Sequence, residues 1–483
     1  MGDNLKEKTI SALKWSTVDR FGQQGVQLLL TLILAQLLSP DDFGTIGVIT
    51  VFTALSFIMV ESGFGQALIR KKDADNKDFS TIFYFNIGLA VVLYLILFFL
   101  SSLIANYFHQ PVLENLSHLL FISILFNAMY LVPFVKLGAK LDYKSIAIVN
   151  IISTTFSGIT GVTLAFLGYG VWALAWQTVL YHLVRVICFH YFVKWKPVLF
   201  FSFHTIKELS SFSLNLLGTG ILNIVFSNIY ILILGRTFPI KETGYYTQAN
   251  KFSETSNYTF SSILSGSTYN LFVQIYDQTE RLKRVFREAI RKTALIVIPV
   301  TLFLIAVAHP LIVTLFRDKW ISIVPYYQII CAANLFAPLY MINYNLLNAK
   351  GLTKTTFRIE IFRKSAILVS IFICFRWGII AMLTGYMLVN WLVFFISMLQ
   401  VKKTIDHYWR NQITDILPGL KIGLVVAICS YSLSFLISLP ILLLATQGFL
   451  AATLYVFYLK KTENELYNKG IHFLKSKWQI LNQ

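Results

Sequence analysis

The chain is built mainly of apolar runs that are long enough to cross a membrane as helices. A transmembrane helix needs about 20 predominantly apolar residues, and this 483-residue chain is 56% hydrophobic and 13% charged. No soluble globular domain has that balance. The sequence therefore predicts an all-α integral membrane protein with fourteen transmembrane helices, at about residues 10–37, 43–67, 79–106, 113–136, 145–167, 171–193, 208–235, 244–276, 288–316, 321–347, 357–375, 377–400, 413–437 and 439–459.

The positions of Lys and Arg predict how these helices are oriented. The net charge of +18 comes from basic residues spread over the ends of apolar runs, which does not indicate a nucleic-acid patch. With a cytoplasmic N-terminus, 30 of the 41 Lys and Arg residues fall in cytoplasmic segments. Only five fall outside: Arg236, Lys241, Arg317, Lys319 and Arg376. Since cytoplasmic loops are enriched in Lys and Arg, both termini are predicted to be cytoplasmic.

The segment 244–276 is long enough to span a bilayer but is crowded with polar side chains. At helical spacing, Lys251, Glu254 and Tyr258 share one face, followed by serines at 261, 262 and 265. Hydrocarbon cannot satisfy such groups, so this helix must face protein or a water-filled cavity. We expect it to line a polar chamber around which the other helices are arranged.

The first predicted span carries a similar polar stripe, made of Ser16, Arg20, Gln23, Gln24, Gln27 and Thr31. Asp19 adjoins it and is a candidate ion or proton site. Two interpretations stay open for both stripes, namely cavity lining and hydrogen bonds that hold helices together. The other basic residues within spans, Arg185, Arg363, Lys364 and Lys421, are expected to extend towards the membrane interface.

Three motif pairs indicate an internal duplication of six spans. LSPDDFG ends at Gly44 and FPIKETG ends at Gly244, 200 residues later; two further pairs, LIANYF with LIVTLF and GYGVWAL with RWGIIAM, are 208 residues apart. An even number of spans preserves orientation, so the halves are expected to be parallel repeats. The predicted domains are two six-helix bundles, residues 1–203 and 204–405, followed by residues 406–483 with two helices and a basic tail.

Two segments carry a family resemblance. LLSPDDFGTIGVITVF with ESGFGQALIRKKDADNKDFSTIFYFN, and GYYTQANKFSE with QTERLKRVFREAIRK, resemble spans of bacterial flippases for polysaccharide repeat units. These are the O-antigen, colanic-acid and teichuronic-acid type of the multidrug/oligosaccharidyl-lipid/polysaccharide exporter superfamily. The resemblance implies alternating access that moves an undecaprenyl-diphosphate-linked glycan across the bacterial cytoplasmic membrane. It further implies a glycan polymerase and export machinery as partners.

That substrate needs cations for its diphosphate and amides or hydroxyls for its sugars. Arg20 and Lys251, the two deepest cations, are expected to approach each other across the interface of the bundles. The predicted substrate-binding residues are Arg20, Gln23, Gln24, Gln27, Lys251, Glu254 and Tyr258, with Asp19 as the candidate for ion coupling.

Two other classes of protein were weighed against a flippase. A membrane glycosyltransferase or polymerase could use Asp41 and Asp42, but SPDDFG also has the pattern of a helix start, capped by Ser39 or Asp41. A cation-coupled multidrug exporter could use Asp19 and Glu254. The four cysteines are widely spaced and no metal or nucleotide motif is present, so the sequence predicts no cofactor, no metal and no enzyme activity.

Overall fold

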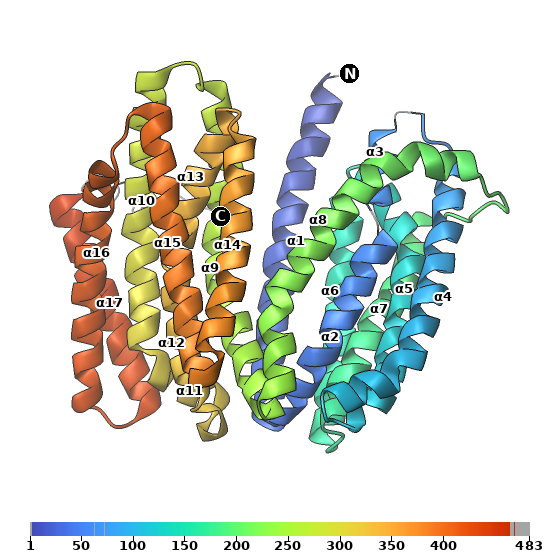
Figure 1. Ribbon diagram of the computed structural model, residues 1–483, viewed down its shortest axis with the longest axis horizontal. Helices are drawn as coiled ribbons and strands as arrows, with labels where there is room; N and C mark the ends of the chain where they lie inside the picture. The colour runs from blue at the N-terminus through green and yellow to red at the C-terminus, as the bar shows by residue number, and fades with distance from the viewer. Residues whose placement is uncertain (1, 62, 72, 464–467, 469–483) are drawn as a thin grey trace, which may run out of the picture. The chain divides into compact units, whose positions relative to one another are not determined.

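The computed structural model describes residues 2–61, 63–71, 73–463 and 468, with side chains other than those of residues 2–10, 215 and 255–267. Within that part the regular structure is entirely helical (Figure 1), which confirms the all-α prediction. The α-helices are α1 Gly2–Leu37, α2 Pro40–Glu61, α3 Phe64–Arg70, α4 Asn76–Tyr107, α5 Val112–Ala139, α6 Tyr143–Phe166, α7 Val171–Val193, α8 Phe203–Thr237, α9 Ile240–Gln274, α10 Thr279–Ala306, α11 Ala308–Phe316, α12 Ile323–Ala333, α13 Ala337–Ala349, α14 Thr353–Cys374, α15 Ile379–Ile405, α16 Trp409–Ser432 and α17 Pro440–Thr462.

Each predicted span coincides with one long helix or with two consecutive shorter ones. The ranges 43–67, 288–316 and 321–347 are each divided in two, as α2 with α3, α10 with α11, and α12 with α13. By length and composition, eleven segments of the described residues qualify as membrane spans. A multi-span membrane protein is therefore confirmed, whereas the exact number of fourteen spans stays a prediction.

The acidic pair in SPDDFG starts a helix, as expected from its pattern. The Ser39 backbone N–H donates to Asp42 Oδ2 at 2.8 Å, and the Asp42 N–H donates to Ser39 Oγ at 3.2 Å. This reciprocal pair is a capping box, and Pro40 occupies the first helical position, where its missing N–H costs nothing. Asp42 is thus committed to capping α2.

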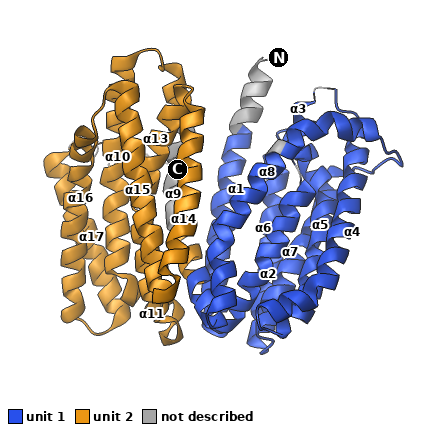
Figure 2. Ribbon diagram, viewed as in Figure 1, with its two compact units in different colours: residues 1–247 blue, residues 248–483 orange. Residues whose placement is uncertain are grey.

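The chain divides into two compact units, residues 1–247 and 248–483 (Figure 2). This division falls within α9, whereas the predicted repeats meet at residue 203. The repeat boundary describes a duplication in the sequence and stays a prediction. In the structure, α8 and the first turns of α9 belong to the same compact unit as α1 to α7.

Packing of α8 explains why unit 1 extends beyond residue 203. Leu209 of α8 is buried in one cluster with Phe64 and Leu68 of α3 and Val132 of α5. The Lys71 ammonium, just after α3, lies 3.0 Å from a Glu208 carboxylate oxygen of α8. This hydrogen bond raises the pKa of Lys71 above its usual value. The start of α8 is therefore fixed to the other helices of unit 1.

Unit 2 is organised around α10, which packs closely against α16. Its buried stripe of Phe286, Ile290 and Ala294 joins a core that also contains Phe394 of α15. Gly419 of α16 faces the backbone of Ala294, so a side chain at position 419 would overlap that backbone. This close approach fixes the two helices together in the middle of the unit.

Candidate functional site

Three long helices of the described chain, α1, α9 and α14, are not among the eleven membrane spans identified by length and composition, and each carries many polar or charged residues in its sequence. Each is followed in sequence by a helix that does qualify, and α9 and α14 are also preceded by one. A polar helix within a membrane bundle must find partners in protein or in water. The sequence predicted this property for α1 and α9 but not for α14.

On α1, the structure places Asp19 in a cluster of amide groups inside unit 1. Gln23 Nε2 donates to Asp19 Oδ1 at 2.6 Å, and Asn150 Nδ2 of α6 lies 3.2 and 3.3 Å from the two carboxylate oxygens. Asp19 and Gln23 were predicted site residues, whereas Asn150 was not. The described contacts of Asp19 are thus to amides rather than to the adjacent Arg20.

The rest of the polar stripe on α1 lies on a less covered side of the helix. α1 packs along α6, with Leu30 lying against Gly158. Arg20 and Gln27 are exposed, and Gln24 is half-buried. Exposed cationic and amide groups on a membrane helix can contact a polar ligand or water without losing any contact that holds unit 1 together.

On α9, the structure describes the predicted residues Lys251 and Glu254, while the Tyr258 side chain lies outside the described residues. Lys251 is half-buried and Glu254 is exposed. Asn250 Nδ2 donates to Glu254 Oε1 at 2.9 Å, one turn apart on the same helix. Next to them, the buried Ser253 Oγ lies 3.5 Å from Asn334 Nδ2, which attaches this part of α9 to the rest of unit 2.

α14 adds a charged cluster to unit 2 that the sequence analysis missed. The Tyr340 hydroxyl of α13 donates to Glu360 Oε1 at 2.7 Å, and Arg363 Nη2 lies 2.8 Å from Glu360 Oε2. Arg363 therefore does not simply extend to the interface as predicted. The spacing of Glu360 and Arg363, i and i+3 on a helix, was the signal that could have identified the pair.

Arg185 of α7 also differs from its prediction, because it is held inside unit 1. Its Nη1 donates to the Tyr130 hydroxyl at 2.8 Å, and its guanidinium carbon lies 4.2 Å from the centre of the Tyr130 ring. Asn127 Nδ2 donates to the same hydroxyl at 2.7 Å. A cation stacked on aromatic rings and hydrogen-bonded in this way stabilises the packing of α5 against α7.

A family model described as "Polysaccharide biosynthesis protein" matches residues 33–325, which is well over half of the chain. The chain belongs to this family. The match includes α2 to α11 in full and therefore contains Asn150, Lys251 and Glu254, while Asp19 and Arg20 precede it.

Curated relatives of this polysaccharide biosynthesis protein cover much of its length. The lipopolysaccharide biosynthesis protein WzxC of Escherichia coli (strain K12) is 25% identical over 90% of this chain and 89% of its own length. The succinoglycan biosynthesis transport protein ExoT of Rhizobium meliloti (strain 1021) is also 25% identical, over 66% of this chain and 65% of its own length.

Solved structures show the same fold at low sequence identity. The lipid II flippase MurJ in an inward closed conformation superposes with a TM-score of 0.77 at 16% identity, covering 94% of this chain and 99% of its own. An inward-facing multidrug resistance MATE family transporter of the MOP superfamily superposes with a TM-score of 0.62 at 15% identity, covering 79% and 95%. The polysaccharide biosynthesis protein thus has the fold of multi-span membrane transporters.

In this family member, each unit contributes polar groups of a different kind. Unit 1 provides the Asp19 amide cluster and the exposed cation Arg20, and unit 2 provides Lys251, Glu254 and the Glu360–Arg363 pair. Amide and hydroxyl groups can donate to and accept from sugar hydroxyls, and guanidinium and ammonium groups can bind phosphate oxygens. Each unit by itself thus carries polar groups of kinds that can bind sugar hydroxyls or phosphate oxygens.

Proposed function

We propose that this protein moves a polyprenyl-diphosphate-linked oligosaccharide from the inner to the outer leaflet of a bacterial cytoplasmic membrane, by alternating access, for polysaccharide biosynthesis. The observation that carries the proposal is the match to WzxC over nine tenths of this chain, together with charged side chains on helices within a transporter fold. The names of the two relatives refer to lipopolysaccharide biosynthesis and to succinoglycan transport. Of the two solved structures compared above, the lipid II flippase MurJ has the higher TM-score.

The substrate's parts match the polar groups described above. Arg20 and Lys251 are the cations that bind the diphosphate, while Gln23, Gln24 and Gln27 bind sugar hydroxyls, together with Glu254 and Tyr258. Asp19, held by two amide donors, is the candidate for ion coupling. Charges within a membrane bundle are costly and mark substrate or ion pathways by default, which supports this assignment.

We further propose that the protein acts as a transporter rather than as a glycosyltransferase. Of the acidic pair that an enzyme could have used, Asp42 is engaged at the start of α2, where it accepts from the Ser39 backbone N–H and hydroxyl. Both hydrogen bonds end on Asp42 Oδ2, so this oxygen serves the helix start, which supports a structural role for Asp42.

The chemical form of accumulated lipid-linked sugar tests the proposed function. In a host that lacks this protein, the polyprenyl-linked repeat unit should accumulate and stay accessible only from the cytoplasmic leaflet, because its synthesis continues without translocation. Extraction of membrane lipids and mass spectrometry of the diphosphate-linked glycans measure this directly. Expression of the wild-type chain from a plasmid should restore the normal pool and polymer export.

An unchanged pool of lipid-linked sugars in that host would contradict the flippase assignment. If the same cells became sensitive to cationic drugs, the cation-coupled exporter would be the better description. Restored export by a related chain of known glycan specificity would identify the repeat unit that is transported.

We propose that both termini and the segment 281–292 are cytoplasmic, on the basis of the asymmetry in Lys and Arg. In a cysteine-free background, a membrane-impermeant thiol reagent added to intact cells should label Cys introduced at Arg317 or Lys319 and miss Cys at Arg281 or Lys403. All four of these side chains are exposed, so the access of the reagent depends only on the side of the membrane on which each one lies. Labelling at position 281 or 403 before the cells are broken would contradict this orientation.

A further inference from the structure

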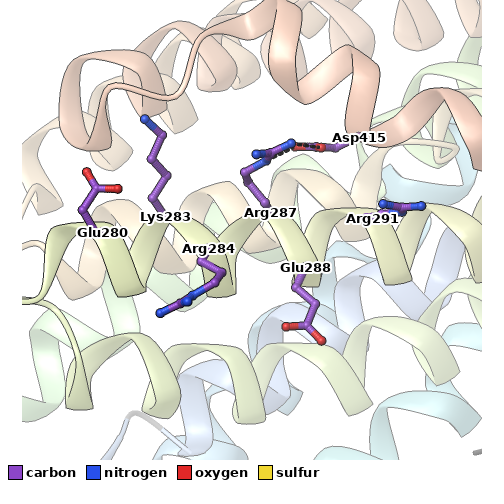
Figure 3. A pocket seen from close by; sticks show the side chains of 7 residues that line it. All are labelled: Glu280, Lys283, Arg284, Arg287, Glu288, Arg291 and Asp415. Atoms are coloured by element: carbon purple, nitrogen blue, oxygen red, sulfur yellow. Dashed lines mark hydrogen bonds and ion pairs between the residues drawn. The ribbon is translucent and has the colours of Figure 1, made fainter. Parts of the chain in front are cut away.

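A basic pocket opens in unit 2 between the first three turns of α10 and the start of α16 (Figure 3). It has a volume of about 510 Å³ and is lined by Glu280, Lys283, Arg284, Arg287, Glu288, Arg291 and Asp415. Further along, α10 and α16 are in close contact at Gly419 and Gly423. At the pocket, large side chains separate the two helices. Its basic lining residues belong to the segment 281–292, which holds more Lys and Arg than any other segment between the predicted spans.

The side of the pocket formed by α16 is fixed by Asp415. Its carboxylate accepts two hydrogen bonds from one guanidinium, from Arg287 Nε at 3.2 Å and from Arg287 Nη2 at 3.0 Å. His407 Nε2 lies 3.1 Å from Asp415 Oδ2, and both His407 and Asp415 are buried. Asp415 therefore has its own partners, and a bidentate pair of this kind holds Arg287 in place.

Two cations of the pocket are not neutralised by carboxylates. Glu288 pairs with Lys292, which lies outside the pocket, and Arg291 pairs with Glu463. Among the described residues, Lys283 and Arg284 form no ion pair. Figure 3 shows Arg287 reaching from α10 to Asp415 and Lys283 projecting from the same side of α10, whereas Arg284 projects from the opposite side of the helix.

The same part of α10 has an apolar face, and this face indicates how deep the helix start lies in the membrane. Leu282, Phe286 and Ile290 recur every four residues and are fully buried in the core of unit 2. The basic side chains lie on the other sides of the helix, and a continuous apolar segment follows from Ala294. A helix with this pattern has its basic turns at the level of the lipid headgroups.

We propose that this pocket binds the phosphate of an anionic membrane lipid, with Lys283 as its direct contact, Arg287 held on the same side of α10 by Asp415, and Arg284 adding positive charge from the other side of the helix. Basic pockets between transmembrane helices on the cytoplasmic side are a recurring site for acidic headgroups. The acyl chains of such a lipid extend along the apolar surface that follows. This site is separate from the polar residues assigned to the transported substrate. The bound lipid would contact both the start of α10 and the start of α16 and so hold them together.

Binding of phosphatidylglycerol to the purified full-length protein tests this site. The thermal unfolding midpoint should rise as phosphatidylglycerol is titrated into protein in phosphatidylcholine nanodiscs. In the double variant Lys283→Gln, Arg284→Gln the apparent affinity should fall by roughly 30-fold, at the typical contribution of a basic residue near an anionic surface. The charge-conserving variant Lys283→Arg, Arg284→Lys should retain binding, which separates loss of charge from loss of folding.

A matched control removes two charges from the same unit on the side of the membrane predicted to be cytoplasmic. Lys402 and Lys403 are exposed in the last turn of α15, outside the pocket, and Lys402→Gln, Lys403→Gln should bind phosphatidylglycerol as the wild type does. Wild-type affinity in the Lys283→Gln, Arg284→Gln variant would overturn the proposal. An equal rise in the midpoint with inorganic pyrophosphate would also overturn it, because the site would then bind a soluble anion.

Discussion

Polymer export should fall by roughly ten-fold to a hundred-fold when Arg20 or Lys251 is replaced with alanine. Each substitution removes a charged donor to the diphosphate, and a hydrogen bond to a charged group contributes roughly 1.5–3 kcal/mol. Arg20 is exposed on α1, so its loss should not alter the packing of unit 1. The measurement is the amount of exported polymer per molecule of protein in the membrane, with membrane abundance determined by quantitative immunoblotting.

The two cations should not be interchangeable with each other. A guanidinium has a planar fork that can bind two phosphate oxygens, whereas an ammonium is a point charge. Arg20→Lys should therefore retain part of the activity and exceed Arg20→Ala. Lys421→Ala is the matched control, since Lys421 is an exposed basic residue on the membrane helix α16 and has no assigned role. It should export polymer as the wild type does.

Export at the wild-type level by well-expressed Arg20→Ala and Lys251→Ala variants would remove both residues from the mechanism. The polar stripes of α1 and α9 would then be explained by hydrogen bonding between helices. A loss of membrane abundance that matches the loss of export would point to a structural role for the residue concerned.

The fold was predictable from the sequence because lipid imposes strong constraints on a chain. Apolar runs of about 20 residues must be helices, and cap residues mark where they begin. The pattern SPDDFG predicted the start of α2, and the hydrogen bonds between Ser39 and Asp42 confirm it. The polar character of α1 and α9 was also visible, since it depends only on the side chains of one helix.

Contacts between helices were not predictable in the same way. The bond from Asn150 to Asp19 joins residues 131 positions apart, and nothing in the pattern of α6 marks Asn150 among other polar residues. Arg363 and Arg185 were expected at the interface because each is near a helix end. Arg363 is linked to Tyr340 by way of Glu360, and Arg185 bonds directly to Tyr130. Both tyrosines lie on other helices and become neighbours of these arginines only when the helices pack.

Replacing Gly44 or Gly244 with alanine should strongly reduce export, because these glycines allow two helices to touch at their backbones. They end the repeated motifs LSPDDFG and FPIKETG, and both lie in unit 1 at the starts of α2 and α9. A Cβ on Gly44 would overlap the carbonyl oxygen of Ile240, and a Cβ on Gly244 would overlap that of Pro40. Backbone atoms cannot rotate away, so the helix starts must move apart, at a typical cost of about 1–3 kcal/mol for overpacking.

The expected result for either variant is a lower thermal unfolding midpoint of the purified protein together with export well below the wild-type level. Gly88→Ala is the matched control, since Gly88 lies within the membrane helix α4 and a Cβ there would meet open space. Alanine is also the better helix former, so this variant should be at least as stable as the wild type. If Gly44→Ala and Gly244→Ala behaved like Gly88→Ala, close contact between α2 and α9 would not be required for folding or for transport. If only export fell and the midpoint were unchanged, the contact would be needed in the transport cycle rather than for the stability of unit 1.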